Sequence, residues 1–299
     1  MGKQREEIFK IIDKRRSNEQ LRIIISVPHA GRIIPEDVKQ RLAISLEEAV
    51  TRYDAYTEKI ALELADYAVV QIANTSKHVI NLNRSPVIDK LDLGVVFDPV
   101  GKYHASGRLT ATPTLEDRDN ERLVQLFTHE HTPVWKYDPE NNCYLTEKEL
   151  ISRIKKYHRP YHQNLQSLLE SAANPVVLID LHSMSRGQFD IVLGDCRGRS
   201  TGSIICQNQL LPFLSESNML IGYAGPGKMD IHNRAHYPEA IRHSGGFITM
   251  KYGNPDRGIY AIQIELNRRT CHDYYDAVVD TLKKFIEFLS NNTKQGGFF

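Results

Sequence analysis

Short runs of β-branched and apolar residues recur along the chain and predict buried strands. The clearest runs are LRIIISV at 21–27 and VVLIDL at 176–181, where nearly every position is apolar. Continuous runs of this kind are typical of strands that are covered on both faces, as in a parallel sheet. Further runs predict strands at 68–73, 78–82, 189–194, 218–225, 245–253 and 259–266.

Helices are predicted between these strands, two of them from capping boxes at 45–48 and 146–149. The first box predicts a helix over 45–67. The second predicts a helix over 146–171, which Pro160 should kink or break. The other predicted segments are a charged helix at 3–16, a loop at 84–114 and a last helix at about 270–290.

This alternation of strands and helices predicts an α/β fold, with a mixed, mostly parallel sheet flanked by helices. The sequence contains no internal repeat, no Ser/Gly linker and no shift in composition. We therefore expect a single domain over residues 1–299, with a core at about 21–290 and a frayed tail at 291–299.

The composition is that of an ordinary globular protein, with 41% hydrophobic and 25% charged residues. There are 38 Lys and Arg against 37 Asp and Glu, so a net charge of +1 does not favour binding to nucleic acid or to an anionic membrane. No run approaches the roughly 20 apolar residues that span a bilayer. The scattered cysteines argue against a disulfide framework and suit reduced thiols in the cytoplasm.

Polar residues that could carry chemistry stand at or near the ends of predicted buried strands: His29, His182 and Glu265. Ligands gather beyond the carboxyl ends of strands in open α/β sheets, and two histidines with a carboxylate suit a catalytic zinc. Asp54, on the predicted 45–67 helix, is the best candidate for a third ligand. We expect Asp180 to point to the opposite side of its strand from His182, in a supporting or structural role.

Each of these residues also has an ordinary explanation by itself. A lone histidine at a strand end is usually a hydrogen-bonded polar residue, and Asp54 could be a solvated helix residue. Glu265 is harder to explain in this way, because its neighbours are apolar and burying an unpaired carboxylate is costly. A buried glutamate should have a partner or a raised pKa, and both are properties of a general base.

Eight short segments stand out over about residues 21–270: SVPHAG, YDAYT, VINLNRSP, RPYH, LIDLHSMS, FDIVLGD, SGGFITMKYG and AIQIELNR. Taken together, they resemble the N-formylglutamate amidohydrolase family. They occur in the family's order, and eight in register are specific although each is weak by itself. The family is similar to zinc carboxypeptidases and aspartoacylase-like enzymes, so the resemblance implies a zinc-carboxypeptidase-like (phosphorylase/hydrolase-like) fold.

The resemblance also implies roles for individual residues. His29, Asp54 and His182 would hold one zinc ion per chain, although the carboxypeptidase pattern has its acidic ligand where Arg32 stands here. Glu265 matches the position of the general base. Asn83 and Arg84 match the pair that binds the substrate carboxylate. Two further candidates for substrate binding, Arg186 and Arg268, follow from their positions just past His182 and Glu265, with a salt bridge on the final helix as the alternative for Arg268.

The implied activity is hydrolysis of the amide bond of a small, acidic N-acyl amino acid. N-formyl-L-glutamate, which would give L-glutamate and formate at the end of a histidine-degradation route, is the leading substrate. Alternatively, the same zinc site acts on another N-acyl amino acid or a short peptide, or the chain is a non-catalytic ligand-binding homologue. His129 and His131 have a metal-site spacing but should face solvent, and His162 should pack its helix or approach the site.

Overall fold

The computed structural model describes residues 8–16, 19–88, 122–128, 132–185, 187–202, 205–223 and 243–295. The chain divides into two compact units that interleave along the sequence. The first takes Met1–Phe9, Gly31–Tyr53 and Ala73–His162, and the second takes Lys10–Ala30, Asp54–Ile72 and Gln163–Phe299. The single domain over residues 1–299 stays a prediction. Arg186, His129 and His131 lie outside the described residues.

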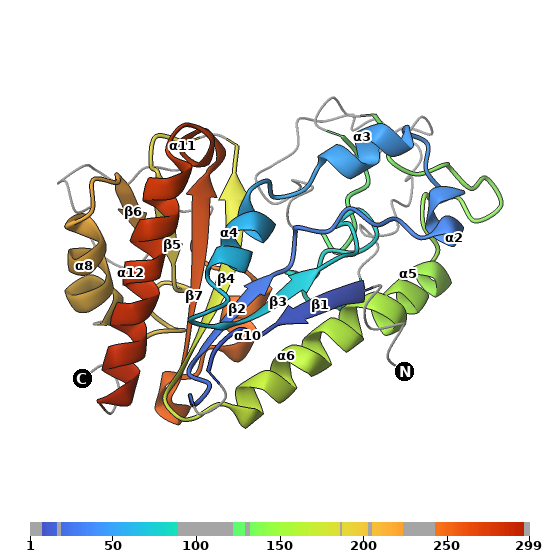
Figure 1. The fold of residues 1–299 in the computed structure, drawn as a ribbon. Coiled ribbons are helices and arrows are strands. Elements are labelled where there is room, and N and C mark those ends of the chain that lie inside the picture. The colour runs from blue at the N-terminus through green and yellow to red at the C-terminus, as the bar shows by residue number, and fades with distance from the viewer. Residues whose placement is uncertain are drawn as a thin grey trace. The chain divides into compact units, whose positions relative to one another are not determined.

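The described residues form one sheet of seven strands in the order β1-β3-β2-β4-β7-β5-β6, which belongs almost entirely to the second unit (Figure 1). The strands are β1 (Phe9–Ile12), β2 (Ile23–Val27), β3 (Val69–Ala73), β4 (Val176–Met184), β5 (Ile191–Gly194), β6 (Ile221–Tyr223) and β7 (Ile259–Asn267). Strand β2 is parallel to β3 and β4, β4 to β7, and β5 to β6, whereas β5 runs antiparallel to β7. The predicted mixed, mostly parallel sheet is therefore confirmed.

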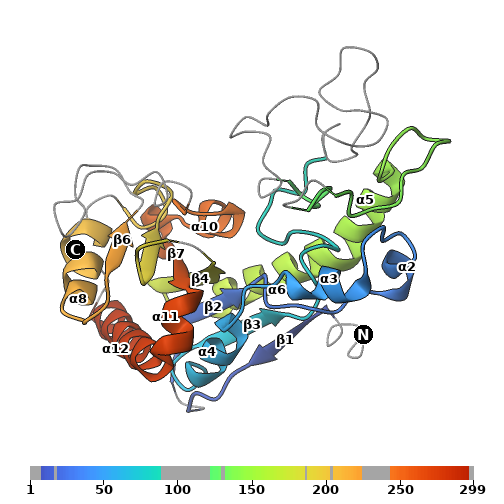
Figure 2. The ribbon, with the colours of Figure 1, turned by 90° about the horizontal axis from the view of Figure 1, so that it is seen from above.

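Helices cover both faces of the sheet (Figure 2). On one face lie α4 (Thr57–Glu63) and α12 (Tyr275–Lys294), and on the other lie α10 (Phe247–Tyr252) and the later turns of α6 (Arg159–Ser171). Asn164 of α6 donates from its side-chain amide to the Gln71 Oε1 atom of β3 over 2.8 Å. This contact fixes α6 on the face opposite α4 and α12.

The main apolar core fills the space between the sheet and helices α4 and α12. Side chains alternate across a strand, so every second residue of β4 and β7 enters this core, as Ile179 and Ile262 do. Leu64 near α4 and Phe285 of α12 pack against them. The intervening residues of β4 and β7 face the other way, and these carry the polar groups of the candidate site.

The remaining elements are short. The first unit contains α2 (Glu36–Lys39), α3 (Leu46–Thr51), α5 (Glu147–Arg153) and the π-helical segment η3 (Ile154–His158). The second contains η4 (Cys206–Leu210), α8 (Leu211–Ser215), the 3₁₀ turn η5 (Pro255–Arg257) and α11 (Arg268–Asp273). The predicted capping box at Thr146 and Glu149 is present at the start of α5. The helix was predicted to be disturbed at Pro160. The structure has a π-helical segment there, η3, which ends two residues before Pro160.

Two predicted helices were wrong. The part of 3–16 that the structure describes includes a strand, β1, because residues 9–12 pair at the edge of the sheet beside β3 and this pairing outweighs a weak helical pattern. The helix predicted over 45–67 is two helices, α3 and α4. The chain leaves helical geometry between them, and Tyr56 adopts the left-handed region at φ 70°. Asp54 therefore lies in a break between helices and not on a helix.

Two predicted strands were also wrong. Residues 78–82 form turns, in which the Asn81 N–H donates to the Leu123 carbonyl and not to a strand of the sheet. The segment 245–253 contains helix α10. Its buried residues Ile248, Thr249 and Tyr252 follow helical spacing, although isoleucine, threonine and tyrosine individually favour strands.

The C-terminal tail is more ordered than predicted. Helix α12 continues to Lys294, and residues 296–299 lie outside the described residues. Within the described part of the chain, no helix combines the length and the apolar character needed to cross a membrane.

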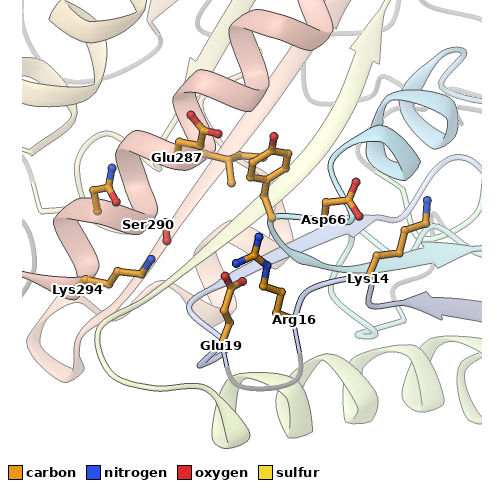
Figure 3. Close-up of a pocket in the computed structure, with 10 residues that line it drawn as sticks. Lys14, Arg16, Glu19, Asp66, Glu287, Ser290 and Lys294 are labelled. Carbon is orange, nitrogen blue, oxygen red and sulfur yellow. The ribbon is translucent and has the colours of Figure 1, made fainter.

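A pocket of about 600 Å³ lies in the second unit, at the amino ends of β2 and β3 (Figure 3). Its lining mixes exposed cations and anions, among them Lys14, Asp66 and Lys294. His29 follows the carboxyl end of β2, so the pocket is at the opposite edge of the sheet from the candidate site. We assign it no function.

Candidate metal centre

The paired strands β4 and β7 place four polar side chains on one face of the sheet. In their parallel register, Asp180 stands beside Gln263 and His182 beside Glu265. All four are at most 8% exposed. The residues between them turn the opposite way into the apolar core, as Leu181 and Ile264 do. Glu265 therefore has polar neighbours on its own face, His182 and Gln263, even though its sequence neighbours are apolar.

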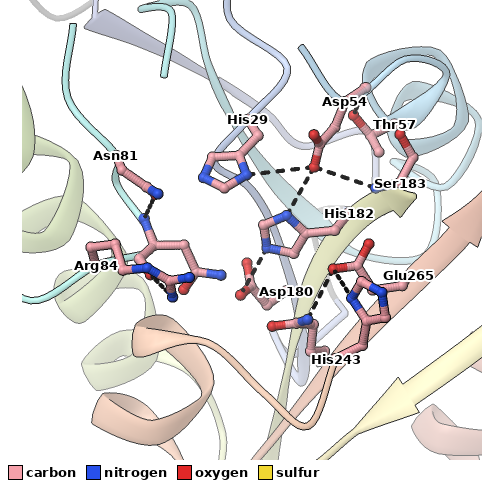
Figure 4. Close-up of polar contacts among 12 residues, drawn as sticks. His29, Asp54, Thr57, Asn81, Arg84, Asp180, His182, Ser183, His243 and Glu265 are labelled. Atoms are coloured by element: carbon pink, nitrogen blue, oxygen red, sulfur yellow. Dashed lines mark hydrogen bonds and ion pairs between the residues drawn. The ribbon is translucent and has the colours of Figure 1, made fainter. Parts of the chain in front are cut away.

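The expected orientation of Asp180 was wrong. Asp180 and His182 are two residues apart on β4, and residues at that spacing share a face of a strand. The Asp180 Oδ2 atom lies 3.1 Å from the His182 Nε2 atom (Figure 4). Asp180 thus contacts one ring nitrogen of His182, Nε2, while the other, Nδ1, faces Asp54.

His29, Asp54 and His182 come together in the second unit (Figure 4). Their potential ligand atoms all lie within 4.8 Å of one another. The Asp54 Oδ2 atom is 3.0 Å from the His182 Nδ1 atom and 3.5 Å from the His29 Nδ1 atom. Asp54 is brought here because its backbone N–H donates to the His29 carbonyl over 2.9 Å. The two sequence-distant loops are thereby joined at the carboxyl ends of the strands.

The other contacts of Asp54 orient its carboxylate. Besides the two histidines, Oδ2 accepts a hydrogen bond from the Ser183 backbone N–H over 3.3 Å. The Arg268 Nη2 atom lies 3.5 Å from Oδ1, and Arg268 Nε also donates to the Ser183 hydroxyl over 3.0 Å. Arg268 begins helix α11, and Asp54, with which it forms this ion pair, lies outside that helix. The guanidinium therefore engages one carboxylate oxygen while the other faces the histidines.

This group of residues fits a divalent metal ion. Two imidazoles and one carboxylate are a donor set of catalytic zinc sites. Burial disfavours the charged form of His182, but Asp180, Asp54 and Glu265 outweigh it and raise the pKa of His182 well above its ordinary value. Three carboxylates and one guanidinium meet here among the described residues, so negative charge predominates when the histidines are neutral. The donors and the charge both favour a cation at this position.

Glu265 lies beside this group, and its contacts include a residue that the sequence interpretation missed. The Glu265 Oε1 atom is 3.1 Å from the His243 Nδ1 atom and accepts from the Gln263 side-chain amide over 3.0 Å (Figure 4). His243 precedes SGGFITMKYG and follows no predicted strand, so neither periodicity nor position drew attention to it. Only its proximity to Glu265 distinguishes it.

Asn83 and Arg84 belong to the first unit, where side chains bind three consecutive backbone carbonyls around them. The Leu82 carbonyl is 2.8 Å from the His162 Nε2 atom, and the Arg84 carbonyl is 2.9 Å from the His158 Nε2 atom. The Asn83 carbonyl accepts from the Arg84 guanidinium over 3.2 Å. Because a carbonyl only accepts hydrogen bonds, both histidines carry a proton on Nε2 in these contacts.

The two histidines also support each other. The rings of His158 and His162 stack with their centroids 4.2 Å apart, and both side chains are buried. We expected His162 either to pack its helix on the sheet or to approach the site. In the structure it binds the Leu82 carbonyl and stacks on His158. The Asn83 backbone N–H donates to the Asn81 side-chain oxygen over 2.9 Å, so the turn that carries Asn83 and Arg84 is held from several sides.

Arg32, which stands where the carboxypeptidase pattern has an acidic ligand, makes a different contact in the first unit. Its guanidinium lies over the ring of Tyr53, 4.2 Å from the centroid. Gly31 beside it has no room for a side chain, because a Cβ would collide with the Thr75 carbonyl. This close approach accounts for the glycine of the SVPHAG segment.

A family model described as N-formylglutamate amidohydrolase matches residues 21–272. The chain belongs to this family. The matched range includes His29, Asp54, His182 and Glu265. No curated protein matches the sequence closely enough to be counted.

Two solved structures share the fold of this N-formylglutamate amidohydrolase family member. The crystal structure of N-formylglutamate amidohydrolase from Ralstonia eutropha JMP134 has a TM-score of 0.71 and 18% identity, covering 97% of this chain and 99% of that chain. Gene product Atu2144 from Agrobacterium tumefaciens has a TM-score of 0.61 and 14% identity, covering 95% of this chain and 94% of that chain. At such identities the likeness establishes the fold.

Proposed function

We propose that this protein is a zinc-dependent amidohydrolase that converts N-formyl-L-glutamate and water into L-glutamate and formate. The observation that carries the proposal is the meeting of His29, Asp54 and His182 within 4.8 Å, with Glu265 on the strand next to His182. Family membership supports the reaction class. By the same resemblance, the reaction would complete a histidine-degradation route.

In this proposal His29, Asp54 and His182 hold the zinc ion. When bound, zinc lowers the pKa of a water molecule towards about 7 and polarises an amide carbonyl. Glu265 removes a proton from water, and the water oxygen forms a bond to the formyl carbon. Glu265 then returns the proton to the amide nitrogen as the carbon–nitrogen bond breaks, so one formate and one glutamate leave.

Recognition of the substrate carboxylates is assigned to cationic and multi-donor groups. Asn83 and Arg84 carry this role by resemblance, and their turn is held rigid by the contacts of its backbone carbonyls. A guanidinium in a fixed position can bind a carboxylate through two parallel hydrogen bonds. Arg268 is paired with Asp54, so we assign it mainly to orienting that ligand.

The proposal is tested by a hydrolysis screen on zinc-loaded protein, with zinc content measured on the same preparation. The panel compares N-formyl, N-acetyl and peptide-linked derivatives of glutamate and aspartate. We expect about one zinc ion per chain, turnover of N-formyl-L-glutamate above the others, and loss of turnover after chelation. His272→Ala is the matched control, because the His272 side chain is 75% exposed.

Other outcomes of the screen and of the zinc measurement would assign a different function to the protein. Faster turnover of an acetylated or peptide-linked compound would keep the zinc chemistry and replace the substrate. Failure to bind zinc at all would contradict the metal centre and favour a non-catalytic ligand-binding homologue.

A further inference from the structure

The two carboxylate oxygens of Glu265 have different surroundings. Oε1 accepts from the Gln263 amide over 3.0 Å and lies 3.1 Å from the His243 Nδ1 atom. Among the described residues, no hydrogen bond reaches Oε2. The carboxylate is thus held by one oxygen, and the other is left for a reacting molecule.

The loop that carries His243 is fitted closely against the end of β5. The His243 backbone carbonyl occupies the space that a Cβ on Gly194 would need. In the next turn the Cys196 N–H donates to the Ser244 carbonyl over 2.5 Å, and Gly245 takes a positive φ of 126°. The backbone from His243 to Gly245 is therefore determined by the end of β5.

The position of His243 is not explained by core packing. Its side chain is 23% exposed, whereas Glu265 beside it is 8% exposed as a residue. Because a carboxylate only accepts hydrogen bonds, the 3.1 Å contact is favourable when Nδ1 carries a proton. A donor on Oε1 stabilises the ionised carboxylate and restricts rotation of the side chain.

We propose that His243 is a positioning residue that, together with Gln263, fixes Oε1 of Glu265 and leaves Oε2 as the oxygen that exchanges protons with water and the leaving amine. This proposal rests on the proposed function, since it deepens the role of Glu265 in that reaction. It adds a residue from a loop that no motif identified. It also distinguishes the roles of the two oxygens.

Groups on the neighbouring strands also face Glu265, and their chemistry decides which of them can donate to its carboxylate. His182 is its register partner on β4, and Val192 is its register partner on β5. Gln263 lies on β7 itself, and His243 comes from the loop after the undescribed residues. Val192 is apolar and His182 is assigned to the metal, so Gln263 and His243 supply the donors to Oε1.

The test compares His243→Ala with His243→Asn in zinc-loaded protein. Asparagine places an amide N–H close to the position of histidine Nδ1, whereas alanine leaves Oε1 with one donor fewer. We expect His243→Ala to retain zinc and to lose about 10- to 100-fold in kcat, the usual effect of removing a supporting hydrogen bond at a metal site, with KM little changed. His243→Asn should recover most of this loss, and His272→Ala should behave as the parent.

A second readout follows the Glu265 carboxyl group directly. The acidic limb of the kcat/KM profile should move to higher pH in His243→Ala, because the ionised carboxylate has lost a donor, and should return towards the parent in His243→Asn. Unchanged kinetics in His243→Ala would overturn the proposal. So would an asparagine variant as impaired as the alanine variant, or loss of zinc from His243→Ala.

The proposal can fail separately from the proposed function. A parent protein that binds zinc but hydrolyses none of the panel would contradict the reaction. Crystal structures of the zinc-loaded parent and of both variants would still show whether the Glu265 side chain changes orientation in His243→Ala and keeps the parent orientation in His243→Asn. An unchanged orientation in His243→Ala would overturn the role of His243 whatever the substrate is.

Discussion

The Asp180 Oδ2 atom lies 3.1 Å from the His182 Nε2 atom, on the side of the ring away from Asp54. A carboxylate on one imidazole nitrogen fixes the tautomer and orientation of the ring, so that the other nitrogen points at the candidate metal position. This pairing follows from strand geometry, because Asp180 and His182 share a face of β4.

We therefore predict that Asp180→Asn weakens zinc binding by about 10- to 100-fold without removing a ligand. The amide keeps the shape of the side chain but loses the negative charge that orients and polarises His182. Competition with a chelator of known affinity measures the change, and thermal unfolding of both metal-loaded proteins is the control. An affinity equal to that of the parent would mean that Asp180 is only structural.

A second prediction concerns Glu265→Gln. Glutamine keeps the size of the side chain and can still contact Gln263 and His243, but it cannot accept a proton from water. The variant should fold, retain zinc and lose on the order of 10²–10⁴ in kcat, the range for removing a general base. Zinc content, melting temperature and turnover are measured on one preparation. Loss of zinc would make Glu265 a ligand, and nearly normal turnover would place the base elsewhere.

The sheet and the strand-end residues of the site could be predicted because they depend on local pattern. The β-branched runs before His29 and around Glu265 became β2 and β7, as expected of strands buried on both faces. The carboxyl ends of parallel strands lie at one edge of a sheet, which is why His29 and His182 could be expected together.

The rest of the site depends on contacts between distant segments that no local pattern encodes. Asp54 reaches His29 through a backbone hydrogen bond across a break between two helices, which the capping signal at Ser45 did not reveal. His243 is brought to Glu265 by a loop fitted against Gly194. Helix α10 was misread as a strand because its composition favours strands, while its buried positions have helical spacing.

Arg84→Lys tests recognition of the substrate. Lysine keeps the positive charge but cannot form two parallel hydrogen bonds with a carboxylate. KM for an acidic N-acyl substrate should rise more than kcat falls, because the proposed proton transfer at Glu265 is untouched. Steady-state kinetics at several substrate concentrations measure both constants. Kinetics identical to those of the parent would remove Arg84 from recognition.

His162→Leu tests whether the turn around Asn83 and Arg84 must be held. Leucine fills similar space but leaves the Leu82 carbonyl without its donor, so the turn should become less ordered. KM for the acidic substrate should rise while zinc content stays at the parent level. His162→Gln, which can donate from a similar position, should recover much of the loss. If glutamine and leucine variants have the same KM, the hydrogen bond is not what matters.

The last prediction concerns His78, which belongs to the first unit and has no exposed surface. Within the described ranges of the chain, neither ring nitrogen has a hydrogen-bond partner. Burial, with smaller effects from Lys77 and Arg52, lowers the pKa of His78 from 6.5 to about 3. The folded protein thus keeps His78 neutral, whereas the unfolded chain takes up a proton below pH 6.5. The contribution of His78 to stability is fully present above pH 6.5 and is lost as pH falls towards about 3.

Replacing His78 with leucine should therefore remove part of the acid sensitivity of the fold. Between pH 6.5 and 3 the free energy of unfolding should fall less steeply with decreasing pH than in the parent, by up to about 1.4 kcal/mol per pH unit. At neutral pH the variant should be as stable as the parent or more stable, because a buried polar group without a hydrogen bond has been removed. Urea unfolding of both proteins at pH 7.5, 6 and 5 measures the difference, with His272→Leu as the exposed control. Parallel pH dependence in the His78 variant and the parent would contradict the lowered pKa of His78.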